Sequence, residues 1–89
     1  MEGKLFKVTE RAWTNYIRVW YELDDNESVL AFMFKVGLDQ VHINFGIQIP
    51  IDYLTGHKAI EITSTQFVEI MGIFGARILE ECMAITQKK

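Results

Sequence analysis

The side chains with the most reactive chemistry in this sequence are one cysteine and two histidines. Cys82 follows Glu80 and Glu81 near the end of a helical pattern, where negative charge disfavours the thiolate that nucleophilic catalysis and metal binding need. His42 and His57 have no helical spacing that would pair them as metal ligands. We therefore expect a non-enzymatic protein that holds no metal and no cofactor.

A second group of side chains combines aromatic rings with hydrogen-bond donors. Protein interfaces are enriched in Trp, Tyr and Arg, whereas sheets of this composition also bind single-stranded nucleic acid, with bases stacked on the rings. The carboxylates at residues 22–27 would repel phosphates, so we favour a protein partner over nucleic acid or an ordinary solvated sheet. If the predicted strands pair as hairpins, the partner-binding face carries Tyr16, Arg18, Trp20, Lys35, His42, Asn44 and Gln48.

Small side chains interrupt the predicted C-terminal helix, although each glycine there costs about 1 kcal/mol relative to alanine. Steps of three and four residues place them on one side of the helix. Close packing on the helix's own sheet would offset that cost, and helix packing across a two-fold dimer axis is the alternative. The predicted dimer contact comprises Gly72, Gly75, Ala76, Ile73, Leu79 and Met83.

The elements that must position these residues are mainly strands. Apolar residues occupy every odd position of residues 41–49, which predicts a half-buried strand. Residues 28–36 predict a preceding strand, joined to it by a hairpin at residues 37–40. Residues 14–23 fit a strand or a helix, but their aromatic and β-branched composition and the acidic turn at residues 24–27 favour a strand.

The C-terminal part predicts a strand followed by a long helix. Residues 58–62 alternate again, and Thr63 and Gln66 have the spacing of a capping box. Apolar residues then recur at three- and four-residue steps as far as Ile85. The fold class expected is α+β: an antiparallel β-meander sheet of four to five strands, with residues 4–8 as a candidate edge strand, and one long C-terminal helix packed on one face.

Length and composition limit the remaining possibilities. The chain has 89 residues, so we expect one domain over residues 1–89. Its net charge of -3 lacks the positive excess of a duplex-DNA binder. A single cysteine favours a reducing compartment, and no apolar run has the length of a signal peptide or a membrane span. We expect a cytoplasmic protein.

Two segments resemble the single-strand-binding transcriptional coactivator family. Residues 58–63, read KAIEIT, followed by Gln66 and Phe67, are similar to the last strand and helix start of that family, where a Lys-Gly-Ile-x-Leu-x pattern precedes Gln-Trp. Residues 16–21 are similar to one of its aromatic strands. The chain departs from the family at Ala59, where the family has glycine, and in its acidic charge. The resemblance implies a meander with a C-terminal helix and binding of single-stranded nucleic acid.

The expected function is a small interaction module, an adaptor or inhibitor of another macromolecule, that acts as a homodimer. One helix can cover only one sheet face, so an isolated copy would expose a sizeable apolar patch. The small size would suit a phage or mobile-element accessory protein. The alternative is a single-strand nucleic-acid binder that uses Tyr16, Arg18, Trp20 and Lys35. A third hypothesis is a hydrolase or isomerase site at a subunit interface using one of the histidines.

Overall fold

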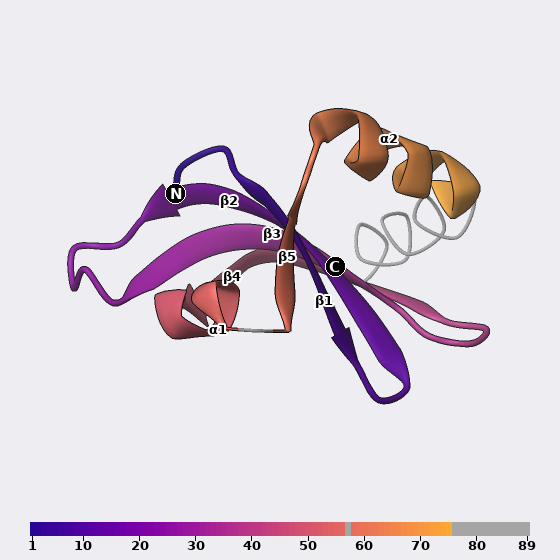
Figure 1. The fold of residues 1–89 in the computed structure, drawn as a ribbon, viewed down its shortest axis with the longest axis horizontal. Coiled ribbons are helices and arrows are strands. Elements are labelled where there is room, and N and C mark those ends of the chain that lie inside the picture. The colour runs from indigo at the N-terminus through magenta and orange to yellow at the C-terminus, as the bar shows by residue number, and fades with distance from the viewer. Residues whose placement is uncertain (57, 76–89) are drawn as a thin grey trace, which may run out of the picture.

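The computed structural model describes residues 1–56 and 58–75, which form a five-stranded antiparallel sheet and two short helices (Figure 1). The sheet order is β4-β3-β2-β1-β5, so the first four strands form a meander and the fifth pairs with the free side of the first. The elements in chain order are β1 (Leu5–Glu10), β2 (Trp13–Glu22), β3 (Ser28–Val36), β4 (Val41–Pro50), α1 (Ile51–Thr55), β5 (Ala59–Ile62) and α2 (Ser64–Ile73).

The predicted strands and their connections are confirmed. The ambiguous segment at residues 14–23 is the strand β2, and the acidic turn joins it to β3. In that turn Asn26 has a φ of 58°, and Asp25 Oδ1 accepts hydrogen bonds from the backbone N–H groups of Glu27 and Ser28 at 2.9 and 3.0 Å. Aspartate and asparagine stabilise turns in this way, which explains why the chain reverses here.

The capping box that begins α2 is also confirmed. Thr63 Oγ1 accepts a hydrogen bond from the Gln66 backbone N–H at 3.1 Å, and the Thr63 N–H donates to Gln66 Oε1 at 2.9 Å. Two backbone donors that lack partners inside the helix are thereby satisfied. The strand-to-helix junction is therefore determined locally by residues 63–66.

One prediction about the elements is wrong, and one short helix was missed. The first strand is not at an edge, because β1 lies between β2 and β5. The helix α1 was not predicted. Of the predicted long C-terminal helix the structure describes only the first part: α2 has ten residues, with Phe74 as its C-cap. Gly72 and Gly75 flank this end, and glycine is a poor helix former. Residues 76–89 lie outside the described part of the chain.

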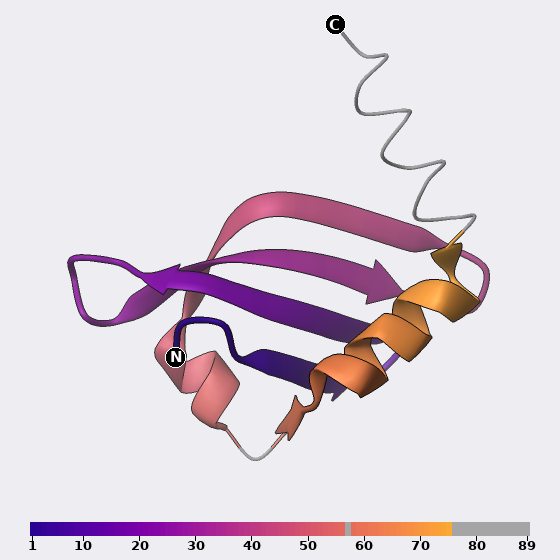
Figure 2. The same cartoon turned by 90° about the horizontal axis from the view of Figure 1, so that it is seen from above.

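Apolar side chains fill both faces of the sheet, and each helix covers a different face (Figure 2). The helix α2 packs through Phe67 on what we call the α2 face, and α1 packs through Leu54 on the α1 face. The buried strand residues of the α2 face are Leu5, Tyr16, Phe34, Val41 and Ile43. Those of the α1 face are Phe6, Val8, Ile17, Val19, Val29, Ala31, Met33 and Ile49.

Two irregularities in strand pairing decide which side chains reach which face. The pairing of β2 with β3 shifts between Val19 and Tyr21, and the pairing of β3 with β4 shifts opposite Gly46, whose φ is 72°. Because a bulge inserts one extra residue, it exchanges the faces of all side chains beyond it. In β4 the apolar side chains before Gly46 therefore lie on the α2 face, whereas Ile47 and Ile49 pack on the α1 face.

Candidate functional site

The seven residues predicted to form one partner-binding face are divided between both faces. Tyr16, Arg18 and Trp20 belong to the α2 face, whereas the register places Lys35 beside His42 on the α1 face. Asn44 pairs with Met33 of the α1 face and Gln48 with Leu30 of β3. The prediction of a single shared face is wrong because the strands pair in a different register from the one assumed. Tyr16 is also buried, at 7% exposure, rather than open.

A groove on the α2 face brings two of the predicted residues together with four others. It has a volume of about 280 Å³ and lies where α2 crosses β2, β3 and β4. Its lining contains one cation among apolar and aromatic side chains. The lining residues are Arg18, Trp20, Phe32, Phe45, Phe67 and Met71.

The bulges produce this groove by re-aiming aromatic rings. The ring of Trp20 crosses toward β4 and comes within 3.6 Å of the position that a Cβ on Gly46 would occupy. The rings of Phe32 and Phe45 pack at 5.3 Å between centroids. Trp20 nevertheless remains 38% exposed and Phe45 55% exposed, so solvent or a partner can reach both rings. The floor is supported by Phe67, which is buried.

Four groove residues were missed because the sequence alone does not show where α2 crosses the sheet. The missed residues are Phe32, Phe45, Phe67 and Met71. The only sequence signal was Gly46 inside an otherwise alternating strand, because an interior glycine is typical of a bulge or a close approach of another group.

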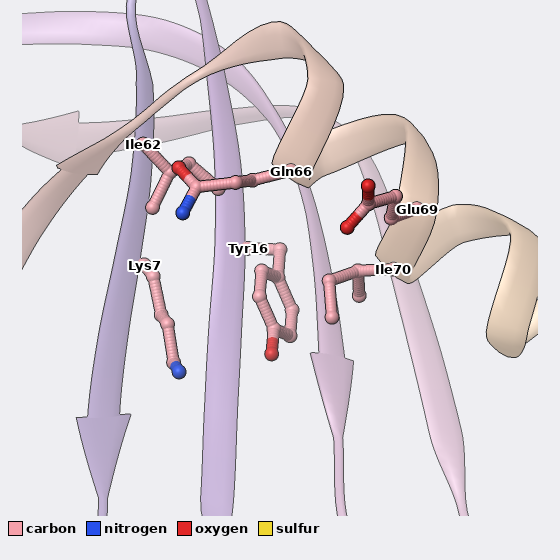
Figure 3. A pocket seen from close by; sticks show the side chains of 6 residues that line it. All are labelled: Lys7, Tyr16, Ile62, Gln66, Glu69 and Ile70. Atoms are coloured by element: carbon pink, nitrogen blue, oxygen red, sulfur yellow. The ribbon is translucent and has the colours of Figure 1, made fainter.

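A second hollow on the α2 face, of about 200 Å³, surrounds Tyr16 (Figure 3). The Tyr16 ring lies between Lys7 of β1 and Ile70 of α2, and its hydroxyl points away from Gln66. Burial raises the pKa of the Tyr16 phenol. This hollow combines one cation and one carboxylate with apolar walls around the phenol. Its lining residues are Lys7, Tyr16, Ile62, Gln66, Glu69 and Ile70.

The α1 face carries a hydrogen-bonded chain in a hollow of about 290 Å³. Asn15 Nδ2 donates to the Tyr53 hydroxyl at 2.9 Å, and that hydroxyl donates to Glu10 Oε1 at 2.7 Å. Burial raises the pKa of Tyr53, and the hydrogen bond and charge of Glu10 raise it further, to about 12. These two hydrogen bonds connect α1 to both β1 and β2.

Replacing Tyr53 with phenylalanine tests this chain. We expect the variant to lose about 1 kcal/mol of unfolding free energy at neutral pH, because the hydrogen bonds disappear. A folded-state pKa of about 12 lies above the ordinary 10.0, so wild-type stabilisation is complete below pH 10 and is lost as pH rises through 12. The difference between the proteins should therefore shrink in that window, as measured by urea unfolding. A constant difference through pH 12 would contradict the raised pKa.

A cluster of three side chains lies at the hairpin end of the α1 face. Lys35 Nζ lies 5.4 Å from the centroid of the Trp13 ring, and the His42 ring lies 5.3 Å from it. A Cβ on Gly37 would come within 2.8 Å of the Trp13 ring, so glycine permits this close approach. The sequence analysis placed Lys35 and His42 on one face, and they do lie side by side. The aromatic ring that both of them contact is that of Trp13, which was not predicted.

The predicted dimer residues are described only in part. Gly72 and Ile73 are exposed, Ile73 to 72%, and a Cβ at Gly72 or Gly75 would meet no described atom within 4 Å. The glycines therefore do not serve close packing on the sheet, at least against the described residues. Ala76, Leu79 and Met83 lie outside residues 1–56 and 58–75, as do Cys82 and His57.

The described residues show neither a metal site nor a membrane-spanning helix, and the chain matches no known protein. Within residues 1–56 and 58–75, no group of three or more His, Cys, Asp or Glu side chains could hold a metal ion. Neither helix of that part has the length and apolar character that crossing a membrane demands. No family model matches the chain, and neither a curated protein nor a solved structure is significantly similar to it. Evidence on function therefore comes from the geometry.

Proposed function

We propose that this chain is a small non-enzymatic interaction module that binds another protein through the groove on its α2 face and acts as a homodimer. The observation that supports it most strongly is the exposure of Trp20 and Phe45 beside the buried floor residue Phe67. Aromatic side chains around a central pocket are typical of the residues that dominate binding energy at protein interfaces. An adaptor or an inhibitor could use such a groove.

The partner we propose is a protein segment that carries a bulky apolar side chain next to a carboxylate. The apolar side chain would fill the space between Trp20, Phe45 and Met71. Arg18 is exposed at the same groove, and its guanidinium matches a carboxylate in a two-pronged hydrogen bond. The groove thus offers one apolar contact for affinity and one charge for orientation.

A peptide-display selection with the full chain as bait tests this proposal. We expect enrichment of peptides that combine an apolar anchor with Asp or Glu. Binding of a labelled peptide should weaken at least about 30-fold in Trp20→Ala, the ~2 kcal/mol of an interface hot spot. Arg18→Gln should weaken binding and reduce its salt dependence, because it removes the charge that meets the carboxylate.

The matched control is Tyr21→Ala. Tyr21 adjoins Trp20 in the sequence and is 47% exposed, yet it does not line the groove, so its removal should leave peptide affinity nearly unchanged. A selection that yields no peptide, or a peptide whose affinity is insensitive to both Trp20→Ala and Phe45→Ala, would refute the proposed groove function.

Single-stranded nucleic acid is the second candidate partner. The feature that favours it is Arg18 in one groove with Trp20, Phe32 and Phe45, since stacked bases need rings and phosphates need cations. A short labelled oligothymidine distinguishes the candidates. Binding that weakens steeply with salt and is lost in Trp20→Ala would support nucleic acid, and no binding at low salt would eliminate it.

A further inference from the structure

The two edges of the sheet differ in length and charge. At one edge β5 has four residues, and its Glu61 forms an ion pair with Lys4 at 3.5 Å. At the other edge β4 has ten residues and contains no Asp, Glu, Lys or Arg. No described strand pairs with the outer side of β4. A long edge strand presents a row of backbone N–H and C=O groups to which another strand can hydrogen-bond.

Natural proteins usually protect such an edge with charges, shortness, proline, bulges or a covering element. Among the residues that the structure describes, β4 is protected only by the bulge at Phe45 and Gly46 and by a proline at its last position, Pro50. Residues 41–44, which pair regularly with β3 before the bulge, contain none of these devices. The lack of charge is specific to β4, because each other strand has at least one charged side chain, for example Lys7, Arg18, Lys35 and Glu61.

We propose that residues 41–45 of β4 pair antiparallel with the same residues of a second copy of this chain. The two five-stranded sheets then become one continuous sheet across the dimer. This inference rests on the homodimer in the proposed function and names the surface that forms it. The occupant is a second copy because antiparallel pairing of identical strands closes on itself around a two-fold axis.

The direction of the two-fold axis of the proposed dimer accounts for the exposure of Phe45 in a single copy. A two-fold axis between antiparallel strands of one sheet stands perpendicular to the sheet, so the α2 faces of both copies lie on the same side. Phe45 lies on this face at the edge strand and is 55% exposed in one copy. Pairing would bring it to the seam, where the partner strand covers only the side of its ring that faces away from the groove. Because Phe45 also lines the groove, the two grooves would open beside the seam.

Pairing through α2 is one of the dimer contacts that the sequence suggested, and the charges on α2 constrain its direction. Glu69 lies one helical turn before Ile73 and on the same side of α2. A parallel two-fold contact centred on Ile73 would bring the Glu69 carboxylates of both copies together, which is unfavourable, so a contact through α2 is limited to an antiparallel arrangement. Residues 41–45 of β4 bring no like charges together.

Sedimentation of the full chain and three lysine variants tests the pairing. We expect a wild-type dimer, and we expect Asn44→Lys to raise the dimer dissociation constant at least about tenfold, because the two introduced lysines would lie diagonally across the seam, each opposite the partner's His42. Asn44 is half-buried in β4. The matched controls are Ile60→Lys on the β5 edge and Ile73→Lys on α2, both at exposed positions, and both should leave the dimer unchanged.

The possible outcomes distinguish three claims: that β4 forms the dimer contact, that the protein is a homodimer, and that the groove binds a peptide. A dimer that is insensitive to Asn44→Lys but lost in Ile60→Lys or Ile73→Lys would overturn pairing through β4 and leave the homodimer standing. A wild-type monomer would overturn both, while the peptide assay would still test the groove. If Asn44→Lys does not fold, hydrogen exchange of the wild type decides: amides of residues 41–45 should gain protection with rising protein concentration, and unchanged exchange would overturn the pairing.

Discussion

Replacing Phe34 with alanine is expected to lower the free energy of unfolding by about 3–5 kcal/mol, the usual cost of removing a fully buried phenylalanine. Phe34 has 0% exposure at the centre of the α2 face. Its ring stacks on Tyr16 at 5.0 Å and meets the edge of Phe67 at 5.5 Å between centroids. The truncation would leave a cavity under α2, because both neighbouring rings are fixed by the sheet and the helix.

Urea unfolding measures this loss, and Phe45→Ala is the matched control. Phe45 is the same residue type on an adjacent strand, but it is 55% exposed and packs only on the Phe32 ring among the aromatic pairs. Its removal should cost at most about 1.5 kcal/mol, the value of one aromatic pair. Equal losses in the two variants would contradict the burial of Phe34 under α2.

The positions of the strands could be predicted from period-two alternation, but the faces of their side chains could not. Residues 41–49 alternate without interruption, which predicts one apolar face. The bulge at Gly46 instead sends Ile47 and Ile49 to the α1 face. A bulge exchanges the faces of the side chains beyond it, but both faces of this sheet are apolar. Unbroken alternation therefore fits the change of face as well as it fits a regular strand.

A helix could be predicted where a short sequence motif marks its start, as at α2, and was missed where no such motif exists, as at α1. Thr63 and Gln66 form a capping box within four residues, so the start of α2 was evident. The helix α1 has five residues, too few for apolar periodicity to appear. The apolar spacing that predicted a long helix continues past Phe74, but periodicity does not weigh the cost of the glycines on either side of that residue.

The sequence could predict which residue types would form a binding site, but not where on the fold the groove lies. Arg18 and Trp20 were singled out because their residue types suit interfaces, and both line the groove. Alternation predicts only that Phe32 and Phe45 are strand residues, and the capping box of α2 does not show which rings the helix covers. Their place in the groove depends on long-range register and on the crossing of α2, neither of which is encoded in residue spacing.

The second large effect is expected for Leu54→Ala, which should lower the free energy of unfolding by about 2–5 kcal/mol. Leu54 is 2% exposed and is the only buried residue of α1. An isolated helix of five residues is unstable in water, and α1 has no side-chain cap at Pro50. The helix is also held by the Ile51 N–H bond to the Glu27 carbonyl oxygen at 2.8 Å, by the hydrogen bonds of Tyr53, and by the partly buried Ile51 and Tyr53 side chains on the α1 face. Leu54 is the one fully buried anchor among these contacts.

A second measurement distinguishes loss of α1 from a general weakening of the core. If α1 detaches, Tyr53 leaves Asn15 and Glu10, so the phenol that titrates at about 12 in the wild type should titrate closer to 10.0 while the sheet remains folded. The control is Val68→Ala at a 65% exposed position of α2, which should change stability by less than about 0.5 kcal/mol. A folded Leu54→Ala variant with the wild-type tyrosine titration would show that Tyr53 stays bound to Asn15 and Glu10 without the leucine, and that the hydrogen-bonded chain, not apolar burial, holds α1 on the sheet.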